Sequence, residues 1–164
     1  MVSKLDDIFE YLPIEEADRL LKKNYRMGGN VDYTHMGFTH VYKSLLNIVP
    51  KHFTIIDLGC CYAPQCYYFK DYKQYIGVDV EDEERFAIHN TTHYVMSIQR
   101  FIKEELPKLN LNPKQCFAIC SYVPDDEATE LARRTFPNIL VYYPNGGFDQ
   151  LVKRGKEYGF REHE

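Results

Sequence analysis

Two acidic residues stand near the ends of two apolar runs in this chain. The run HFTIIDL contains Asp57 and is followed by Gly59, and the run QYIGVDV contains Asp79. A carboxylate at the end of the second strand of a nucleotide-binding sheet can accept both ribose hydroxyls. Gly59 lets the backbone pass close to a ligand or take a positive φ. Asp79 follows Gly59 by 20 residues, so the pair predicts a nucleotide-type site. The alternative is that Asp57 caps the next helix and Asp79 is an ordinary turn residue.

The loop after Asp57 lacks a phosphate-binding fingerprint. A dinucleotide loop needs the spacing G-x-G-x-x-G, whose bare amides hold the pyrophosphate. Only the first glycine, Gly59, is present here, and an acid just before the loop would repel phosphates. Asp57 suits a ligand that carries positive charge. S-adenosylmethionine has an ammonium and a sulfonium group and no phosphate, so an NAD-dependent oxidoreductase is the least favoured interpretation.

Strands alternating with helices must position these residues. Short apolar runs predict the strands, which are HFTIIDL, QYIGVDV, THYVMS, QCFAICSYV and NILVYY, with FREHE as a sixth. The helices between and after them are PQCYYFKDY, IQRFIKEELPKLN, PDDEATELARRTF and GFDQLVKRGKEYG, while EDEERFAIHN is a short helix or a loop. This alternation predicts parallel βαβ units with helices on both faces. The expected fold class is therefore α/β, a three-layer αβα Rossmann-like and mostly parallel sheet, truncated after about six strands.

The first fifty residues have a different pattern. Three stretches with helical spacing, LDDIFEYL, PIEEADRLLKKNY and THMGFTHVYKSLLNIV, precede the first strand. We expect residues 1–50 to form an N-terminal helical segment that packs as a lid on a cofactor-binding core, residues 51–164. The two parts together are expected to make one domain, as suits a chain of 164 residues.

Composition narrows the classes of partner. The net charge of -4, with no basic tract longer than two residues, argues against a nucleic-acid partner. An odd number of cysteines, 5 in all, argues against a disulfide framework and favours the cytoplasm. The cysteines and histidines are not paired at a metal-site spacing, so we expect no metal centre. Acidic residues near the start and short apolar runs predict neither a signal peptide nor a membrane span.

The stretches IIDLGCC, YIGVDV, SYVPDD and LVYYPNGG, in that order, resemble the class I S-adenosylmethionine-dependent methyltransferases over roughly residues 35–162. The resemblance implies a Rossmann-like fold, S-adenosylmethionine as cofactor and methyl transfer. It places Asp57 near the methionine ammonium and Gly59 under the methionine moiety. Cys61 and Ala63 stand where the family has its second and third glycines. Asp79 would hold the ribose hydroxyls, and Val80 would lie beside the adenine.

The later strands supply the other residues that the resemblance implies. Ser97 and Ile98, after the third strand, fall where the family contacts the adenine. Ser121 and Tyr122, after the fourth, fall where it builds the wall that faces the methyl acceptor. Tyr122 could stack on a planar acceptor and Asp125 could act as a catalytic base. The alternatives are a rim aromatic for Tyr122 and a helix cap for Asp125.

The sequence also departs from the family. Cys61 and Ala63 are small but are not glycine, and Ser97 replaces an aspartate that many members use. We also expect no counterpart of the family's closing hairpin. The leading hypothesis is a methyltransferase that acts on an unknown small-molecule or protein acceptor. The alternative is a non-catalytic protein of the same fold that binds a nucleoside cofactor or a partner protein. A monomer and a homodimer are both open.

Overall fold

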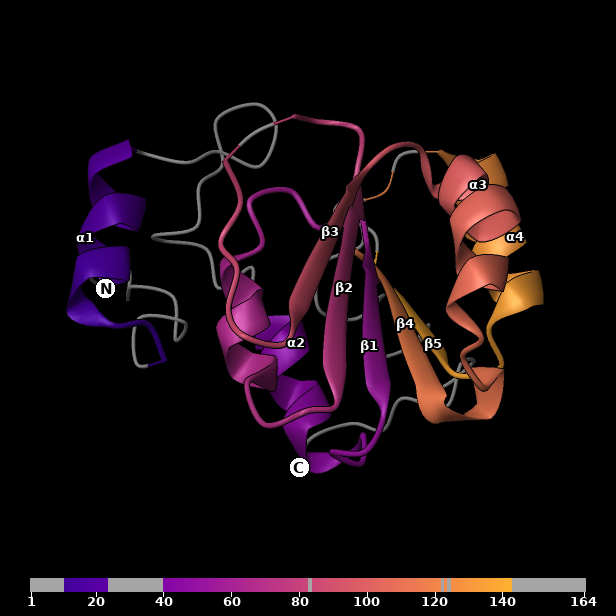
Figure 1. The fold of residues 1–164 in the computed structure, drawn as a ribbon, viewed down its shortest axis with the longest axis horizontal. Helices are drawn as coiled ribbons and strands as arrows, with labels where there is room; N and C mark the ends of the chain where they lie inside the picture. Colours follow the sequence, from indigo (N-terminus) through magenta and orange to yellow (C-terminus); the bar gives the residue numbers. More distant parts are fainter. Residues whose placement is uncertain (1–10, 24–39, 83, 122, 124, 143–164) are drawn as a thin grey trace.

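Five strands form one parallel sheet in the computed structural model, which describes residues 11–23, 40–82, 84–121, 123 and 125–142 (Figure 1). The strands are β1 (Thr54–Leu58), β2 (Gln74–Asp79), β3 (Thr91–Val95), β4 (Cys116–Ser121) and β5 (Ile139–Tyr142). Their order is β3-β2-β1-β4-β5, and each neighbouring pair is parallel. This confirms the predicted α/β class with a Rossmann-like sheet.

The central strand β1 is buried along its whole length. A parallel strand covered on both faces needs apolar side chains on both sides, which explains its β-branched sequence. The register sets Asp57 opposite Gly77 of β2, and Asp79 opposite Val95 of β3. The chain changes direction across the sheet between β1 and β4, and ligands of such sheets bind beyond the strand ends at this switch point.

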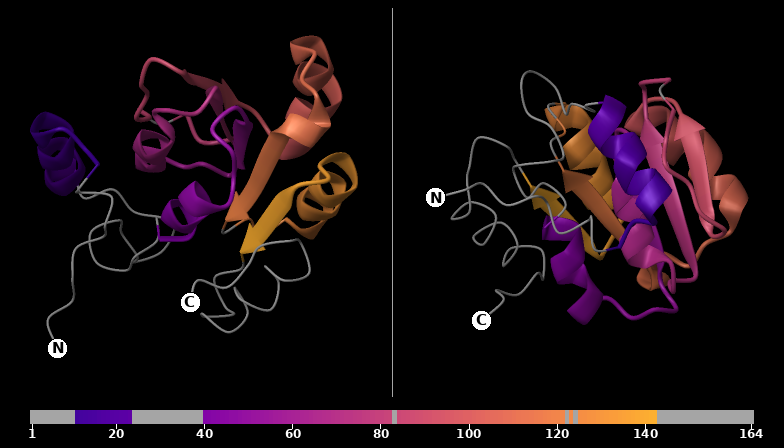
Figure 2. Two further views of the ribbon diagram at one scale, coloured as in Figure 1. Left: turned by 90° about the horizontal axis from the view of Figure 1, so that it is seen from below. Right: turned by 90° about the vertical axis from the view of Figure 1, so that its left-hand side faces the viewer.

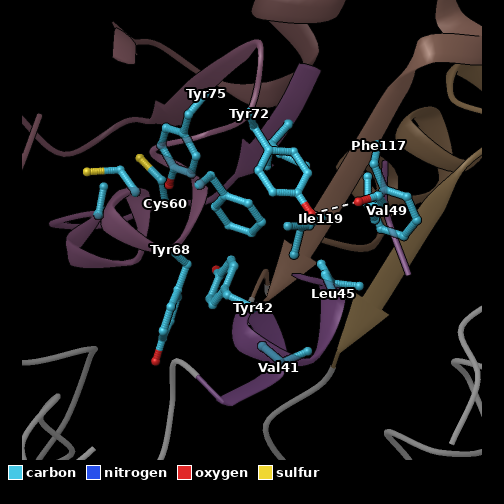
Figure 3. Packing of buried hydrophobic residues seen from close by; sticks show 14 of the residues in the cluster. Val41, Tyr42, Leu45, Val49, Cys60, Tyr68, Tyr72, Tyr75, Phe117 and Ile119 are labelled. Carbon is cyan, nitrogen blue, oxygen red and sulfur yellow. Dashed lines mark hydrogen bonds between the residues drawn. The ribbon is translucent and has the colours of Figure 1, made fainter. Parts of the chain in front are cut away.

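One face of the sheet is covered by α2 (His40–Ser44), η2 (Leu45–Asn47) and η3 (Pro64–Phe69). Side chains of these elements pack on alternate residues of the strands. Figure 3 shows this cluster, in which Tyr42 and Leu45 lie against Ile119, and the Tyr72 hydroxyl donates to the Val49 carbonyl at 2.6 Å. The predicted helix at THMGFTHVYKSLLNIV is confirmed over α2 and η2, and its earlier part lies outside the described residues.

The other face is covered by a second helical layer, seen on the right of the left-hand view in Figure 2. It consists of α3 (Ile98–Arg100), η4 (Phe101–Glu105), η5 (Leu106–Leu109) and α4 (Asp126–Thr135), with η6 (Pro113–Gln115) leading into β4. The first three make the continuous helix predicted at IQRFIKEELPKLN. It changes from α to π turns ahead of Pro107 and to 3₁₀ turns around it. The proline ring and its missing N–H disfavour a regular α-turn there.

The N-terminal part begins with α1 (Ile14–Lys23), which starts just after Pro13 and carries Glu15 and Glu16 in its first turn. Acids at this end complement the helix dipole, so this predicted helix is confirmed. The segment EDEERFAIHN is loop in its described residues. The predicted last helix and the sixth strand FREHE lie outside the described residues. Among the described helices, none has the length and apolar character that crossing a membrane requires.

Candidate functional site

The loop between β1 and η3 has a glycine-like backbone at three alternate positions, of which only the first is a glycine. Gly59, Cys61 and Ala63 have φ values of 86°, 53° and 60°. These are left-handed backbone conformations, which residues other than glycine adopt at a cost of roughly 1–2 kcal/mol. The three residues are the positions where the resembled family has its glycines. Tertiary contacts therefore impose on Cys61 and Ala63 the conformation that glycine would take freely.

Those contacts fasten the loop to the end of β2. The amides of Gly59 and Cys60 both donate to the Val78 carbonyl, at 2.7 and 3.1 Å. The Cys61 amide donates to Asp79 Oδ2 at 2.9 Å, and the Glu81 amide donates to Asp79 Oδ1 at 3.1 Å. Both carboxylate oxygens of Asp79 are thus oriented by backbone donors. The Asp79 side chain stays partly exposed, and its neighbour Val80 is 62% exposed.

Asp57 lies beneath this loop and is completely buried. Its Oδ1 accepts the Tyr42 hydroxyl at 3.1 Å, and its Oδ2 accepts Gln65 Nε2 at 2.8 Å and a short bond from the Tyr75 hydroxyl. The three donors come from α2, η3 and β2. Asp57 therefore sits in a cage of neutral donors, and we refer to Asp57, Tyr42, Gln65 and Tyr75 as the Asp57 cage.

Burial controls the ionisation of the Asp57 cage. Loss of water raises the pKa of Asp57 from 3.8 to about 6, while the bonds from Tyr75, Gln65 and Tyr42 oppose this rise and the nearby charge of Asp79 adds to it. Burial, and then the charge of Asp57, hold the pKa of Tyr42 and of Tyr75 well above the usual tyrosine range. Both hydroxyls therefore remain protonated and can donate to a carboxylate at neutral pH.

Two buried polar atoms, one in the Asp57 cage and one next to it, have no hydrogen-bond partner of ordinary geometry among the described residues. They are Gln65 Oε1 and Ser121 Oγ. The Gln65 amide cannot simply turn over, because its nitrogen already serves both Asp57 and the Cys60 carbonyl. Ser121 ends β4, and its hydroxyl is close enough to that of Tyr42 to offset part of the rise in the Tyr42 pKa. Unsatisfied buried polar atoms are unusual in folded proteins and occur at functional sites.

Arg85 braces the same edge of the sheet. Its guanidinium donates to the carbonyls of Asp79, Glu81 and Tyr94, at 2.9, 3.0 and 3.0 Å. Arginine offers several donors in a rigid plane, so one side chain can tie the ends of β2 and β3 together. The sequence analysis did not select Arg85 or the donors of the Asp57 cage. The one available signal was register, because Tyr75 faces the same side of the sheet as Asp57 once β1 and β2 are aligned.

The structure brings together only some of the residues selected from the sequence. Asp57, Gly59, Cys61, Ala63 and Asp79 meet around the β1–η3 loop, and Ser121 adjoins the Asp57 cage. A second group lies where α3 and α4 begin, and consists of Ser97, Ile98 and Asp125. Tyr122 lies outside the described residues.

The second group has well-defined structural contacts. Ser97 caps α3 by accepting the Arg100 amide at 3.1 Å, and Ile98 is buried in the layer under α3 and α4. Asp125 caps α4 through the Ala128 amide at 3.1 Å and accepts Gln99 Nε2 at 2.8 Å. The bond from Gln99, with that from Ala128, lowers the pKa of Asp125. The described residues contain no group of three or more His, Cys, Asp or Glu that could hold a metal ion.

These observations define the class of protein. The chain contains a Rossmann-like α/β sheet, in which Asp57 and Asp79 lie around one loop at the carboxyl ends of β1 and β2. Comparison with models of known protein families found no matching family, and comparison with curated proteins found no similar sequence. Among solved structures, the chain is similar to a "putative type II methyltransferase" from Anaeromyxobacter dehalogenans, with a TM-score of 0.42 and 15% identity over 60% of this chain. The match spans 42% of that protein's chain.

The left-handed backbone at Cys61 leads to a stability prediction. Cys61→Gly is expected to raise the free energy of unfolding by up to about 1 kcal/mol, since relief of the strained φ outweighs the extra freedom of the unfolded chain. Denaturant unfolding measures the change. Cys116→Gly is the matched control, because Cys116 is buried with an extended φ of -114°, and this substitution should destabilise the protein. A clear loss of stability in Cys61→Gly would contradict the prediction.

Proposed function

We propose that this protein binds S-adenosylmethionine at the carboxyl edge of β1 and β2, and transfers its methyl group to a small-molecule or protein acceptor. The observation that carries the proposal is the alternation of left-handed residues at Gly59, Cys61 and Ala63, with Asp79 bonded to the middle of that loop. Two left-handed residues other than glycine cost folding free energy, and such strain clusters at functional sites. It is understandable if the loop must pass close under a ligand.

Each part of the cofactor has a partner in this proposal. Asp79 would accept the ribose hydroxyls, because each carboxylate oxygen can accept more than the one hydrogen bond it has now. Val80, apolar and exposed beside Asp79, would lie against the adenine, with Ser97 and Ile98 near its edge. The buried charge of Asp57, which no cationic side chain neutralises by direct contact among the described residues, would attract the methionine ammonium from beneath Gly59, Cys61 and Ala63.

The chemical step makes few demands on the protein. Methyl transfer needs an in-line approach and the exclusion of water. Tyr122 would stack on the acceptor, Ser121 would line its site, and Asp125 would take its proton. We place this activity in the cytoplasm, with no nucleic acid and no membrane as partner, and with the protein acting as a monomer or a homodimer.

A second candidate is a non-catalytic protein of the same fold that binds a nucleoside or a partner protein. The Asp57 cage favours this alternative, because both carboxylate oxygens already have side-chain donors and the residue has no exposed surface. A ligand ammonium would have to act through a rearranged cage or from a distance. Under this alternative the adenosine end of the ligand still binds at Asp79, while no methyl group is transferred.

Calorimetric titration with S-adenosylmethionine and with its demethylated product tests the proposal. Asp79→Asn should weaken the binding of both at least about tenfold, because hydrogen bonds to a charged acceptor contribute roughly 1.5–3 kcal/mol each. The amide keeps an acceptor for the Cys61 N–H, so the loop should survive. Asp82→Asn, an exposed acid three residues further on, is the matched control and should bind like the unaltered protein.

The outcomes separate the two candidates. If neither compound binds at millimolar concentration, S-adenosylmethionine is the wrong ligand for either role. If both bind, incubation of the protein with the methyl-labelled cofactor and a cell extract asks whether label reaches an acceptor. If label reaches an acceptor and Asp79→Asn lowers that transfer, the result supports the enzyme. If the cofactor binds and no label is transferred, the result supports the non-catalytic alternative.

A further inference from the structure

Three consecutive residues, Glu84 to Phe86, join the loops of the candidate site to the rest of the molecule. The Phe86 amide donates to the Tyr62 carbonyl at 2.8 Å, within the β1–η3 loop. The Phe86 carbonyl accepts His93 Nε2 of β3 at 2.7 Å. Arg85 holds the ends of β2 and β3 through three carbonyls. This segment, which we call the hub, therefore touches both loops that orient Asp79.

The N-terminal helix α1 contacts the outer side of the hub. Arg19 Nη1 donates to Glu84 Oε1 at 2.9 Å, and the Arg19 guanidinium carbon lies 3.9 Å from the centre of the Phe86 ring. Arg19 also pairs with Glu16 on its own helix at 2.5 Å, which holds the guanidinium in place. Phe86 is fully buried. Figure 1 shows α1 at the side of the molecule, apart from the helices that flank the sheet.

The chain just before α1 has its own attachment. Tyr11 packs edge-on against Tyr68 of η3, with ring centres 4.6 Å apart, and Leu12 is buried in the same core. Loss of the Arg19 contacts would therefore weaken the docking of the helix body, which also packs on this core through Ala17, and would leave Tyr11 and Leu12 in place. A helix of ten residues is marginal in water without tertiary contacts, so its docking depends on the contacts of Arg19 together with the packing of Ala17.

We propose that α1 is a latch, whose docking through Arg19 on the hub keeps the β1–η3 loop and the Asp79 turn ordered. The path is contiguous: Arg19 contacts Glu84 and Phe86, and the Phe86 amide bonds to Tyr62. The preceding residue of that loop, Cys61, bonds to Asp79. Undocking of α1 loosens the loop and removes the orientation of the Asp79 carboxylate. Since coupling between two sites is reciprocal, a ligand that orders the loop also strengthens the docking of α1. This last consequence rests on the proposed function, whereas the link from Arg19 to the loop does not.

Hydrogen exchange on the whole chain tests the link without any ligand. In Arg19→Ala, the amides of Phe86 and Cys61 should exchange about tenfold faster, because an exposed ion pair and a cation–π contact are each of modest strength. The Ala118 amide, bonded within the sheet to the Asn138 carbonyl at 3.0 Å, should be unchanged. Arg100→Ala is the matched control, as it removes a similar ion pair with Glu104, at 2.5 Å, on the other helical layer.

A second variant keeps the test valid if Arg19→Ala folds poorly. Glu84→Gln leaves the guanidinium on Phe86 and removes the charge that pairs with Arg19, so it should raise the same two exchange rates to a smaller extent. Unchanged exchange at Phe86 and Cys61 in both variants, or equal acceleration of Ala118, would overturn the latch. Affinity for the demethylated cofactor should fall in parallel in Arg19→Ala. If the unaltered protein binds no adenosyl compound, the proposed function fails, and the exchange rates alone decide on the latch.

Discussion

Asp57→Asn is expected to raise the free energy of unfolding at pH 7 by about 1–3 kcal/mol. Asp57 is fully buried among neutral donors, and its pKa rises to about 6 because of that burial. A shift of about two units corresponds to roughly 3 kcal/mol of cost for ionising the group in the folded state. Asparagine has the same shape and no charge. It can accept the Gln65 amide and donate to a tyrosine hydroxyl, so the cage stays filled and bonded.

The same substitution should change the pH dependence of stability. Below about pH 4 the carboxyl is protonated in the folded and the unfolded chain. Between about pH 4 and pH 6 the unfolded chain has lost the proton and the folded chain has not, so rising pH favours unfolding. Above about pH 7 both are ionised and the penalty is constant. The advantage of Asp57→Asn should therefore be small at pH 4 and full at pH 7.

The two proteins must be compared with each other at each pH, because His93 also contributes to the pH dependence of stability. Burial lowers the pKa of His93, so this residue makes the folded state less stable as the pH falls, in both proteins. Urea unfolding of the unaltered protein and of Asp57→Asn at pH 4, 5.5 and 7 supplies the difference. Asp71→Asn, at an exposed position, should have the same unfolding free energy as the unaltered protein at each of these pH values. A variant that is less stable than the unaltered protein at pH 7 would mean that the charge of Asp57 is better compensated than its cage implies.

Gly77→Ala is expected to lower the free energy of unfolding by about 3 kcal/mol. A β-carbon at Gly77 would press on His93 Nδ1, and would lie 2.7 Å from His93 Cε1 and 2.9 Å from Cys60 Sγ. Neither neighbour can move easily, since Cys60 is buried and His93 is tied to the Phe86 carbonyl. Overpacking of a core by one methyl group typically costs 1–3 kcal/mol, and here the displaced histidine would also disturb the hub.

A double-mutant cycle separates this clash from a general effect on β2. His93→Ala alone should destabilise the protein, because it leaves the Phe86 carbonyl without that donor and opens space. The double variant Gly77→Ala with His93→Ala should be more stable than the sum of the two single effects by at least about 1 kcal/mol, since the new methyl fills part of that space. Strict additivity would show that His93 is not the obstacle. Thermal unfolding of the four proteins provides the values.

The fold class followed from the sequence because it depends on local patterns. Short β-branched runs such as TIIDL, separated by amphipathic stretches such as DEATELARRT, allow few arrangements other than a parallel sheet with helices on both faces. The ends of α4 could also be predicted from nearby residues, because Asp125 stands before its first turn and Arg133 and Arg134 stand in its last turn. The loop EDEERFAIHN was ambiguous for the opposite reason, because its contacts are with distant partners, namely Arg19, Tyr62 and His93.

The candidate site divides in a similar way. The sequence by itself predicted that Asp57, Gly59 and Asp79 lie at strand ends on one edge of the sheet. The positions of the apolar runs, and their alternation with helical stretches, are enough for that prediction. Only the tertiary structure decided that Asp57 is buried under donors from α2, η3 and β2, and that Cys61 and Ala63 adopt left-handed conformations. Burial and backbone strain depend on contacts between residues far apart in the chain, and no local pattern of residue types records them.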